Sequence, residues 1–85
     1  MPTVLREGGF EVRIYLPPRE HDPAHVHVIR AGGEVIITLG DDTAAPAIRE
    51  AHGMTNRDVL RAYRIVEGHR DALLERWEEY HGAAD

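Results

Sequence analysis

The sequence predicts an α+β domain, in which a four-stranded antiparallel meander is covered by a short helix and a long C-terminal helix. Two observations support this prediction. In the first half of the chain, apolar residues alternate with polar ones and the runs end at glycines or prolines, as in strands joined by tight turns. In the second half, apolar residues recur at spacings of three, four or seven, which is typical of an amphipathic helix.

Four strands are predicted, at residues 3–6, 10–16, 24–30 and 34–39. The first ends at Gly8 and Gly9, because glycine readily adopts the positive φ of a tight turn. The second alternates cleanly from Phe10 onward and ends at Pro17, since proline cannot donate to the ladder. Short links between the strands imply an antiparallel meander.

Two helices are predicted, at residues 45–52 and 56–80. For the short helix, Thr43 supplies an N-cap, Pro46 fits the first turn and Gly53 suits the position after the C-terminus. For the long helix, Thr55 with Asp58 approximates a capping box.

Arg70 interrupts the apolar stripe of the long helix, because an unbroken helix places it between Val66 and Leu73. Either Gly68 breaks the helix and resets its phase, or Arg70 is covered and paired with a carboxylate. Helix interiors tolerate glycine at a cost of ~1 kcal/mol. We therefore expect one long helix that is straight or kinked near Gly68.

All 85 residues are expected to form one domain, with the meander in residues 1–40 and the helical cover in residues 41–85. The chain has no cysteine, which excludes disulfides and thiolate metal sites. A domain this small gains stability from a partner, a second copy or a histidine-bound metal.

Composition also limits the function classes. The N-terminus lacks the apolar run of a signal peptide, and no stretch is long enough to span a bilayer. We therefore expect a cytoplasmic protein without membrane contact. The net charge of -5 argues against binding nucleic acid through bulk phosphate neutralisation.

The densest group of candidate functional residues surrounds the third strand. Alternation places His25 and His27 on one face, about 6.5–7 Å apart along the strand. Their imidazoles suit a divalent transition metal such as zinc, with His21, Asp22 or Asp41 completing the shell. The same pair suits general acid–base catalysis. The alternative is that both histidines only cover a half-exposed strand face.

Residues 48–59 partly resemble a helix–turn–helix, with Gly53 in the turn and Val59 at a suitable offset. Arg49 and His52, however, stand where that motif prefers small and apolar residues. Operator DNA binding is therefore the third functional hypothesis.

Charge along the long helix is ordered by sign. Arg57, Arg61 and Arg64 lie in its N-terminal half, and Asp71 and Glu75 belong to its acidic C-terminal half. Both halves oppose the helix macrodipole, at ~0.3–1 kcal/mol per charge near an end. Local stability does not explain this order, so we expect a binding surface for a second copy or for another protein of matching polarity. A merely solvated charged face is the alternative.

Four segments form a distinctive combination: MPTVLR at residues 1–6, HVHV at 25–28, GGE at 32–34 and LLERWEEY at 73–80. Together they resemble a small bacterial family, domain of unknown function 4160, over nearly the whole chain. Asp22 to Ala24 replaces the two or three prolines that this family usually shows before its first strand histidine.

The resemblance implies little about chemistry, because the family has no established activity. Its members look like halves of two-gene cassettes, in the manner of toxin–antitoxin modules. His25, His27, Arg70 and Trp77 match its signature positions. The preferred function is therefore a protein-binding module paired with a neighbouring small protein. The main alternative is a small ribonuclease, histidine-dependent or metal-assisted, that uses His25 and His27.

Overall fold

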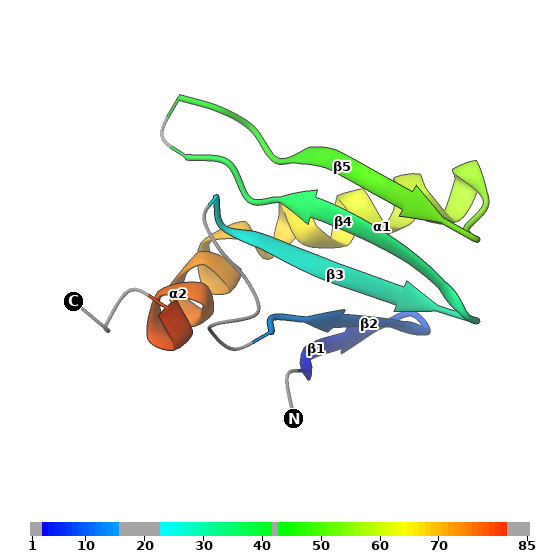
Figure 1. Cartoon of the computed structure of the whole chain (residues 1–85), viewed down its shortest axis with the longest axis horizontal. Helices are drawn as coiled ribbons and strands as arrows, with labels where there is room; N and C mark the ends of the chain where they lie inside the picture. The colour runs from blue at the N-terminus through cyan, green and yellow to red at the C-terminus, as the bar shows by residue number, and fades with distance from the viewer. Residues whose placement is uncertain (1–2, 16–22, 42, 82–85) are drawn as a thin grey trace.

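The computed structural model describes residues 3–15, 23–41 and 43–81. Its elements are β1 (Thr3–Glu7), β2 (Phe10–Arg13), β3 (His25–Arg30), β4 (Gly33–Thr38), β5 (Ala47–His52), α1 (Asn56–Gly68) and α2 (Arg70–His81). The strands form one sheet in the order β1-β2-β3-β4-β5, and each pairs antiparallel with the next (Figure 1). The predicted α+β class is therefore confirmed, with one strand more than expected.

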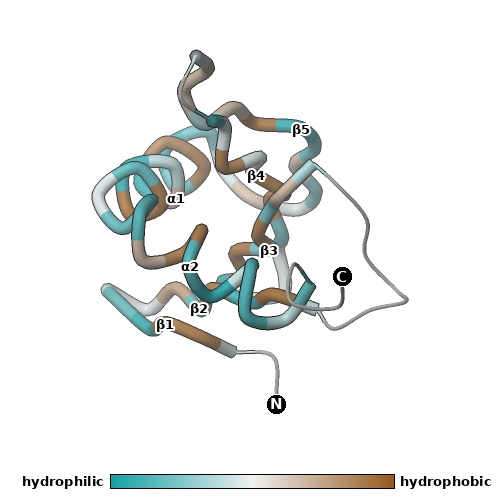
Figure 2. Tube along the Cα trace, turned by 90° about the vertical axis from the view of Figure 1, so that its left-hand side faces the viewer, coloured by the Kyte–Doolittle hydropathy of each residue, from teal (hydrophilic) through white to brown (hydrophobic). Residues whose placement is uncertain are grey.

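One face of the sheet carries the core. Val12, Val28 and Val35 stand opposite one another on β2, β3 and β4, and all three are fully buried. Helix α1 lies against one face of the sheet (Figures 1 and 2) and contributes Ala62 and Val66 to the core. The buried core consists of Phe10, Val12, Ile14, Val26, Val28, Val35, Ile37, Leu39, Ala62, Val66, Leu73 and Trp77.

The short helix predicted for residues 45–52 is wrong, because most of this segment forms the edge strand β5. Ile48 stands opposite Ile37 of β4, and Ala51 stands opposite Val35. The register shifts between these pairs, at a bulge. Without β5, the backbone groups along that side of β4 would lack ladder partners, and unpaired backbone groups are costly where they are covered.

The polar residues that suggest a helix start form a turn instead. Asp41 Oδ1 accepts hydrogen bonds from the Thr43 backbone N–H at 2.8 Å and from its hydroxyl at 2.9 Å. Aspartate commonly stabilises turns by bonding to the backbone two residues on. Because a strand replaces the first helix, the helix–turn–helix hypothesis for residues 48–59 also fails.

The long helix predicted for residues 56–80 is divided into α1 and α2. Its start is as predicted, since the Thr55 hydroxyl accepts the Asp58 N–H at 3.1 Å. His69 breaks the helix, with φ -115° and ψ 16°, and its N–H bonds to the carbonyls of both Ile65 and Val66. Gly68, a poor helix former, precedes the break. None of the described residues belongs to a helix long and apolar enough to cross a membrane.

Helix α2 crosses the end of the sheet where β4 finishes and β3 begins (Figure 1). At that end, Arg70 bonds to the carbonyl of Leu39, which follows β4. Trp77 packs on His25, the first residue of β3. The break at His69 thus lets α1 cover the sheet's face while α2 closes its end.

Strand β2 is shorter than the predicted span of residues 10–16. It ends at Arg13, and Ile14 and Tyr15 continue the chain without ladder pairing. Leu16 lies outside the described residues. Ile14 is nevertheless fully buried, as the alternation predicts.

Candidate functional site: the histidine pair on β3

Strand β3 places His25 and His27 on the face opposite to Val26 and Val28, because side chains alternate along a strand. Both histidines are buried, with exposed fractions of 3% and 9%. His27 stands opposite Arg13 of β2. The shared face agrees with the sequence prediction, but the histidines are far more covered than a half-exposed strand face would leave them.

His27 is held by a carboxylate. Its Nδ1 atom lies 2.6 Å from Oε2 of Glu34 on β4, and the ring meets that of Tyr15 edge-on at a centroid distance of 4.6 Å. An ionised carboxylate only accepts hydrogen bonds, so the Nδ1–H of His27 donates to Glu34. The Glu34 carboxylate therefore orients the imidazole through Nδ1, the arrangement of a carboxylate-oriented histidine.

His25 is oriented by the backbone. Its Nδ1 lies 2.9 Å from the Pro23 carbonyl oxygen, and Nδ1 must carry the proton because a carbonyl only accepts. The ring lies 5.4 Å from that of His27 and 5.2 Å from that of Trp77, between centroids. Both imidazoles therefore have a fixed Nδ1, and the two rings meet at an interplanar angle of 61°.

The ring contacts continue from β3 to α2. Trp77 stacks on His81 at a centroid distance of 3.8 Å. His81 Nε2–H in turn donates to the carbonyl of Tyr15 at 2.8 Å. The histidine pair is consequently packed into a row of rings that ties α2 to the ends of β2 and β3.

A charged network borders the pair on β2. Arg13 Nε donates to Glu11 Oε2 at 2.6 Å, and the Thr3 hydroxyl donates to the same oxygen. Both hydrogen bonds lower the pKa of the Glu11 carboxyl group, and the bond from Arg13 has the larger effect. Conversely, the bond to Glu11 raises the pKa of Arg13, so this pair stays ionised beside His27.

The predicted metal shell lies only partly within the described residues, because His21 and Asp22 lie outside them. Asp41 sits in the turn after β4, and hydrogen bonds from Thr43 lower the pKa of its carboxyl group. Within ranges 3–15, 23–41 and 43–81, no three histidine or acidic side chains are placed to hold a metal ion together. His25 and His27 are the predicted ligands that the structure brings together.

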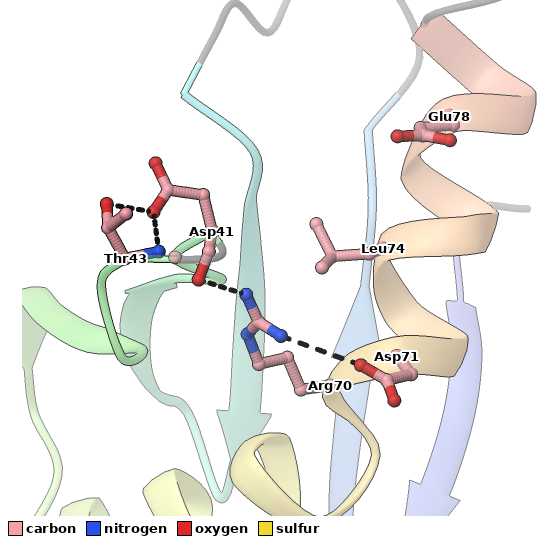
Figure 3. Close-up of a pocket in the computed structure, with 7 residues that line it drawn as sticks. Asp41, Thr43, Arg70, Asp71, Leu74 and Glu78 are labelled. Carbon is pink, nitrogen blue, oxygen red and sulfur yellow. Dashed lines mark hydrogen bonds and ion pairs between the residues drawn. The ribbon is translucent and has the colours of Figure 1, made fainter.

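Arg70 has a separate, positioning role. Its Nε donates to Leu39 O and an Nη donates to Asp41 O, both at 2.7 Å, while another Nη lies 3.5 Å from Asp71 (Figure 3). These contacts fix α2 to the end of β4. The sequence alternatives are both partly right: the helix does break, and Arg70 is paired, but mainly with backbone carbonyls.

A groove of about 470 Å³ surrounds Arg70 (Figure 3). Three of its lining residues are acidic, and the Arg70 guanidinium is already committed to protein partners. The groove is lined by Gly40, Asp41, Thr43, Arg70, Asp71, Leu74 and Glu78.

The five residues predicted to bind a partner are all exposed. Arg57, Arg61 and Arg64 lie on α1, whereas Asp71 and Glu75 lie on the separate helix α2. Asp71 occupies the first turn of α2, where a negative charge is favourable. The macrodipole argument is therefore wrong for Asp71, because it assumes one continuous helix.

The sequence analysis does not connect Glu34, Trp77 or His81 with the histidine pair, although Glu34 and Trp77 lie in the family-like segments 32–34 and 73–80. The short turn at Gly32 could have indicated the role of Glu34. It brings Glu34 opposite Ile29, which lies on the same face of the sheet as His27. No comparable signal exists for Trp77 and His81, because only the break at His69 brings α2 to this end of the sheet.

Comparison with known proteins gives one match. The family described as "Domain of unknown function (DUF4160)" matches residues 9–78. No curated protein matches the chain, and no solved structure matches it.

Proposed function

The chain belongs to the DUF4160 family, and we propose that it is a protein-binding module, acting in the cytoplasm as one member of a toxin–antitoxin-like pair. Its partner is a small protein encoded beside it. The proposal rests on the outer surface of α1, which carries a large apolar side chain among basic ones.

Leu60 is the residue that carries the proposal. Leu60 is 50% exposed, although it lies in the middle of a well-formed helix. Arg57, Arg61 and Arg64 are three, one and four positions away, and helix geometry places residues at the three- and four-residue spacings beside it. An apolar centre with an arginine rim is a common composition of protein interfaces.

The arginines are available to a partner. Arg57 and Arg64 form no ion pair with any described residue, and Arg61 lies 6.0 Å from the ring centroid of Phe10 without a carboxylate partner in the described ranges. Arginine is suited to bidentate contacts with carboxylates. We therefore propose an acidic partner surface, and we propose that Asp71 and Glu75 on α2 meet basic groups of the same partner.

Co-purification with the neighbouring gene product tests this function. With only the partner tagged, the wild-type chain is expected to co-purify at a fixed stoichiometry, with an affinity that falls as salt screens the charges. Leu60→Asp, Arg57→Glu and Arg64→Glu should each weaken binding at least tenfold.

Arg6→Glu is the matched control, because it makes the same charge change on β1. It should bind as the wild type does. Unchanged binding by all three α1 variants, or no complex with the neighbouring protein, would refute the proposal.

A second candidate function is favoured by the His27–Glu34 contact. We propose as the alternative that His25 and His27 cleave RNA, alone or with a bound divalent metal such as zinc. In the metal-free form, His27 Nε2 removes the proton from a ribose 2′-hydroxyl, which attacks the adjacent phosphate. His25, acting as an imidazolium that keeps its Nδ1–H on the Pro23 carbonyl, gives its Nε2 proton to the departing 5′-oxygen, leaving a 2′,3′-cyclic phosphate.

This alternative predicts RNA cleavage by protein purified without a histidine tag. His27→Ala should abolish the cleavage, and Glu34→Gln should reduce it. His69→Ala is the control, because His69 is half-exposed and its ring pairs with Glu7 of β1 rather than with the histidine pair. Metal analysis of the same preparation separates the two forms: stoichiometric metal supports metal assistance. Cleavage that survives in His27→Ala would exclude both.

A further inference from the structure

Strand β5 ends the sheet with an open edge (Figure 1). All six of its residues are exposed, and no strand among residues 3–15, 23–41 and 43–81 pairs with its outer side. Such an edge presents unpaired backbone N–H and C=O groups and is a template for another strand. At the opposite edge, β1 differs, because its Val4 and Leu5 are half-buried against the core.

The charges on β5 restrict which strand can pair with it. Arg49 and Glu50 are adjacent at the middle of the strand, and Arg49 is opposed by no residue of β4 because it sits in the bulge. Charges and bulges on edge strands normally discourage pairing. Here, however, a strand that presents a negative and a positive charge in the reversed order would be attracted rather than repelled.

We propose that this strand is β5 of a second copy of the chain. Two antiparallel copies of β5 overlap completely when a two-fold axis passes between Arg49 and Glu50. In that register, Arg49 faces Glu50 of the second copy, and Glu50 faces its Arg49. The register of greatest overlap is thus also the register in which the charges are complementary.

The faces of the sheet agree with this register. Ile48 and Ala51 lie on the side of α1, because they stand opposite the buried Ile37 and Val35. A two-fold axis normal to the sheet keeps the two faces separate and places Ile48 opposite Ala51 of the second copy. Ile48, which is 47% exposed in the single chain, becomes covered by apolar surface.

The result is a closed, isologous dimer with one continuous sheet across both copies. The surface involved is small, so the association should depend on protein concentration. It uses β5 and leaves the outer surface of α1, with Leu60, free for the partner proposed above. The two proposals therefore rest on different residues and can fail separately.

A charge-swap experiment tests the register. Analytical ultracentrifugation should show a monomer–dimer equilibrium for the wild type between micromolar and millimolar concentrations. Arg49→Glu and Glu50→Arg should each be monomeric, because each places like charges opposite one another at both crossings. An equimolar mixture of these two variants should form a 1:1 heterodimer, and the double swap Arg49→Glu/Glu50→Arg should again form a homodimer.

Arg6→Glu on β1 is the matched control and should dimerise as the wild type does. Circular dichroism of each variant establishes that it is folded, and the mixing experiment remains decisive because it restores an interaction. A monomeric wild type at all concentrations would overturn the inference, as would single variants that dimerise normally or a mixture that stays monomeric. If the wild type is monomeric and the Arg49→Glu variant no longer binds the neighbouring gene product, the edge belongs to that partner. Only the second-copy inference then falls.

Discussion

His27 Nδ1 and Glu34 Oε2 lie 2.6 Å apart across β3 and β4. The imidazole is nearly covered, with 11% of its side chain exposed, whereas 36% of the Glu34 side chain is exposed. The carboxylate therefore fixes the orientation of a buried ring from the start of β4, next to the β3–β4 hairpin. This relationship links the local hairpin to the candidate site and can be tested by itself.

Glu34→Ala should lower the free energy of unfolding by about 1 kcal/mol, because it removes a hydrogen bond to a largely covered donor. Glu34→Gln keeps a neutral acceptor, so its free energy of unfolding should fall between those of Glu34→Ala and the wild type. Urea unfolding measures both changes. Glu67→Ala, at an exposed position on α1, should stay within about 0.5 kcal/mol of the wild type; an equal loss in both alanine variants would contradict the role of Glu34.

Arg13→Gln should change the dependence of stability on pH. The hydrogen bond from Arg13 is the largest cause that lowers the pKa of Glu11 from its ordinary value of 4.5, followed by that from Thr3. A lowered folded-state pKa stabilises the fold above the unfolded-state value, and this contribution is lost as pH falls through the lowered value. The variant should therefore be less stable at neutral pH, and its difference from the wild type should shrink in acid.

Urea midpoints measured from neutral pH down into the acid range would show this convergence. Arg57→Gln serves as the control, because Arg57 pairs with no carboxylate of the described residues and its effect should not vary with pH. A difference for Arg13→Gln that stays constant across the range would show that Glu11 does not carry the effect.

Arg70→Ala should lower the free energy of unfolding by about 2 kcal/mol, since two hydrogen bonds to backbone carbonyls are lost at roughly 1 kcal/mol each. The loss should loosen α2, which Arg70 fixes to the end of β4. Hydrogen exchange of the α2 amides would detect this, with larger changes there than in α1. Uniform changes along both helices would argue against a local clamp.

Gly40→Ala and Gly68→Ala should have opposite effects. Gly40 has φ 75°, a conformation that costs an L-residue about 1–2 kcal/mol, and a Cβ there would collide with the Ala44 carbonyl oxygen. At Gly68 a Cβ meets nothing within 4 Å, so alanine should raise helix stability by up to about 0.5–1 kcal/mol. Thermal unfolding of both variants measures the signs, and a stabilising Gly40→Ala would refute the assigned turn geometry.

Periodicity succeeds where the signal is local. Phe10, Val12 and Ile14 alternate with polar residues and are buried, and the shared face of His25 and His27 follows from the same rule. Thr55 marks the start of α1 for an equally local reason, because its hydroxyl bonds to an amide three residues later.

Periodicity fails where a distant partner decides the structure. Residues typical of a helix start precede residues 47–52. This segment nevertheless forms a strand, because it pairs with the otherwise free side of β4. The placement of α2 after the break at His69 likewise depends on Arg70, whose partners Leu39 and Asp41 lie some thirty positions away in the chain. The sequence next to residues 47–52 does not identify β4 as their partner, and the sequence next to Arg70 does not identify Leu39 and Asp41.

Local patterns are enough to predict the α+β class, the presence of the first four strands and the common face of the two histidines, because side-chain alternation and capping act over a few residues. Three further features become visible only in the folded chain: β5 at the edge of the described sheet, two helices in place of one, and the burial of His25 against Trp77. Those features depend on which backbone groups and surfaces remain unpaired once the sheet has formed, and that is a property of the whole fold.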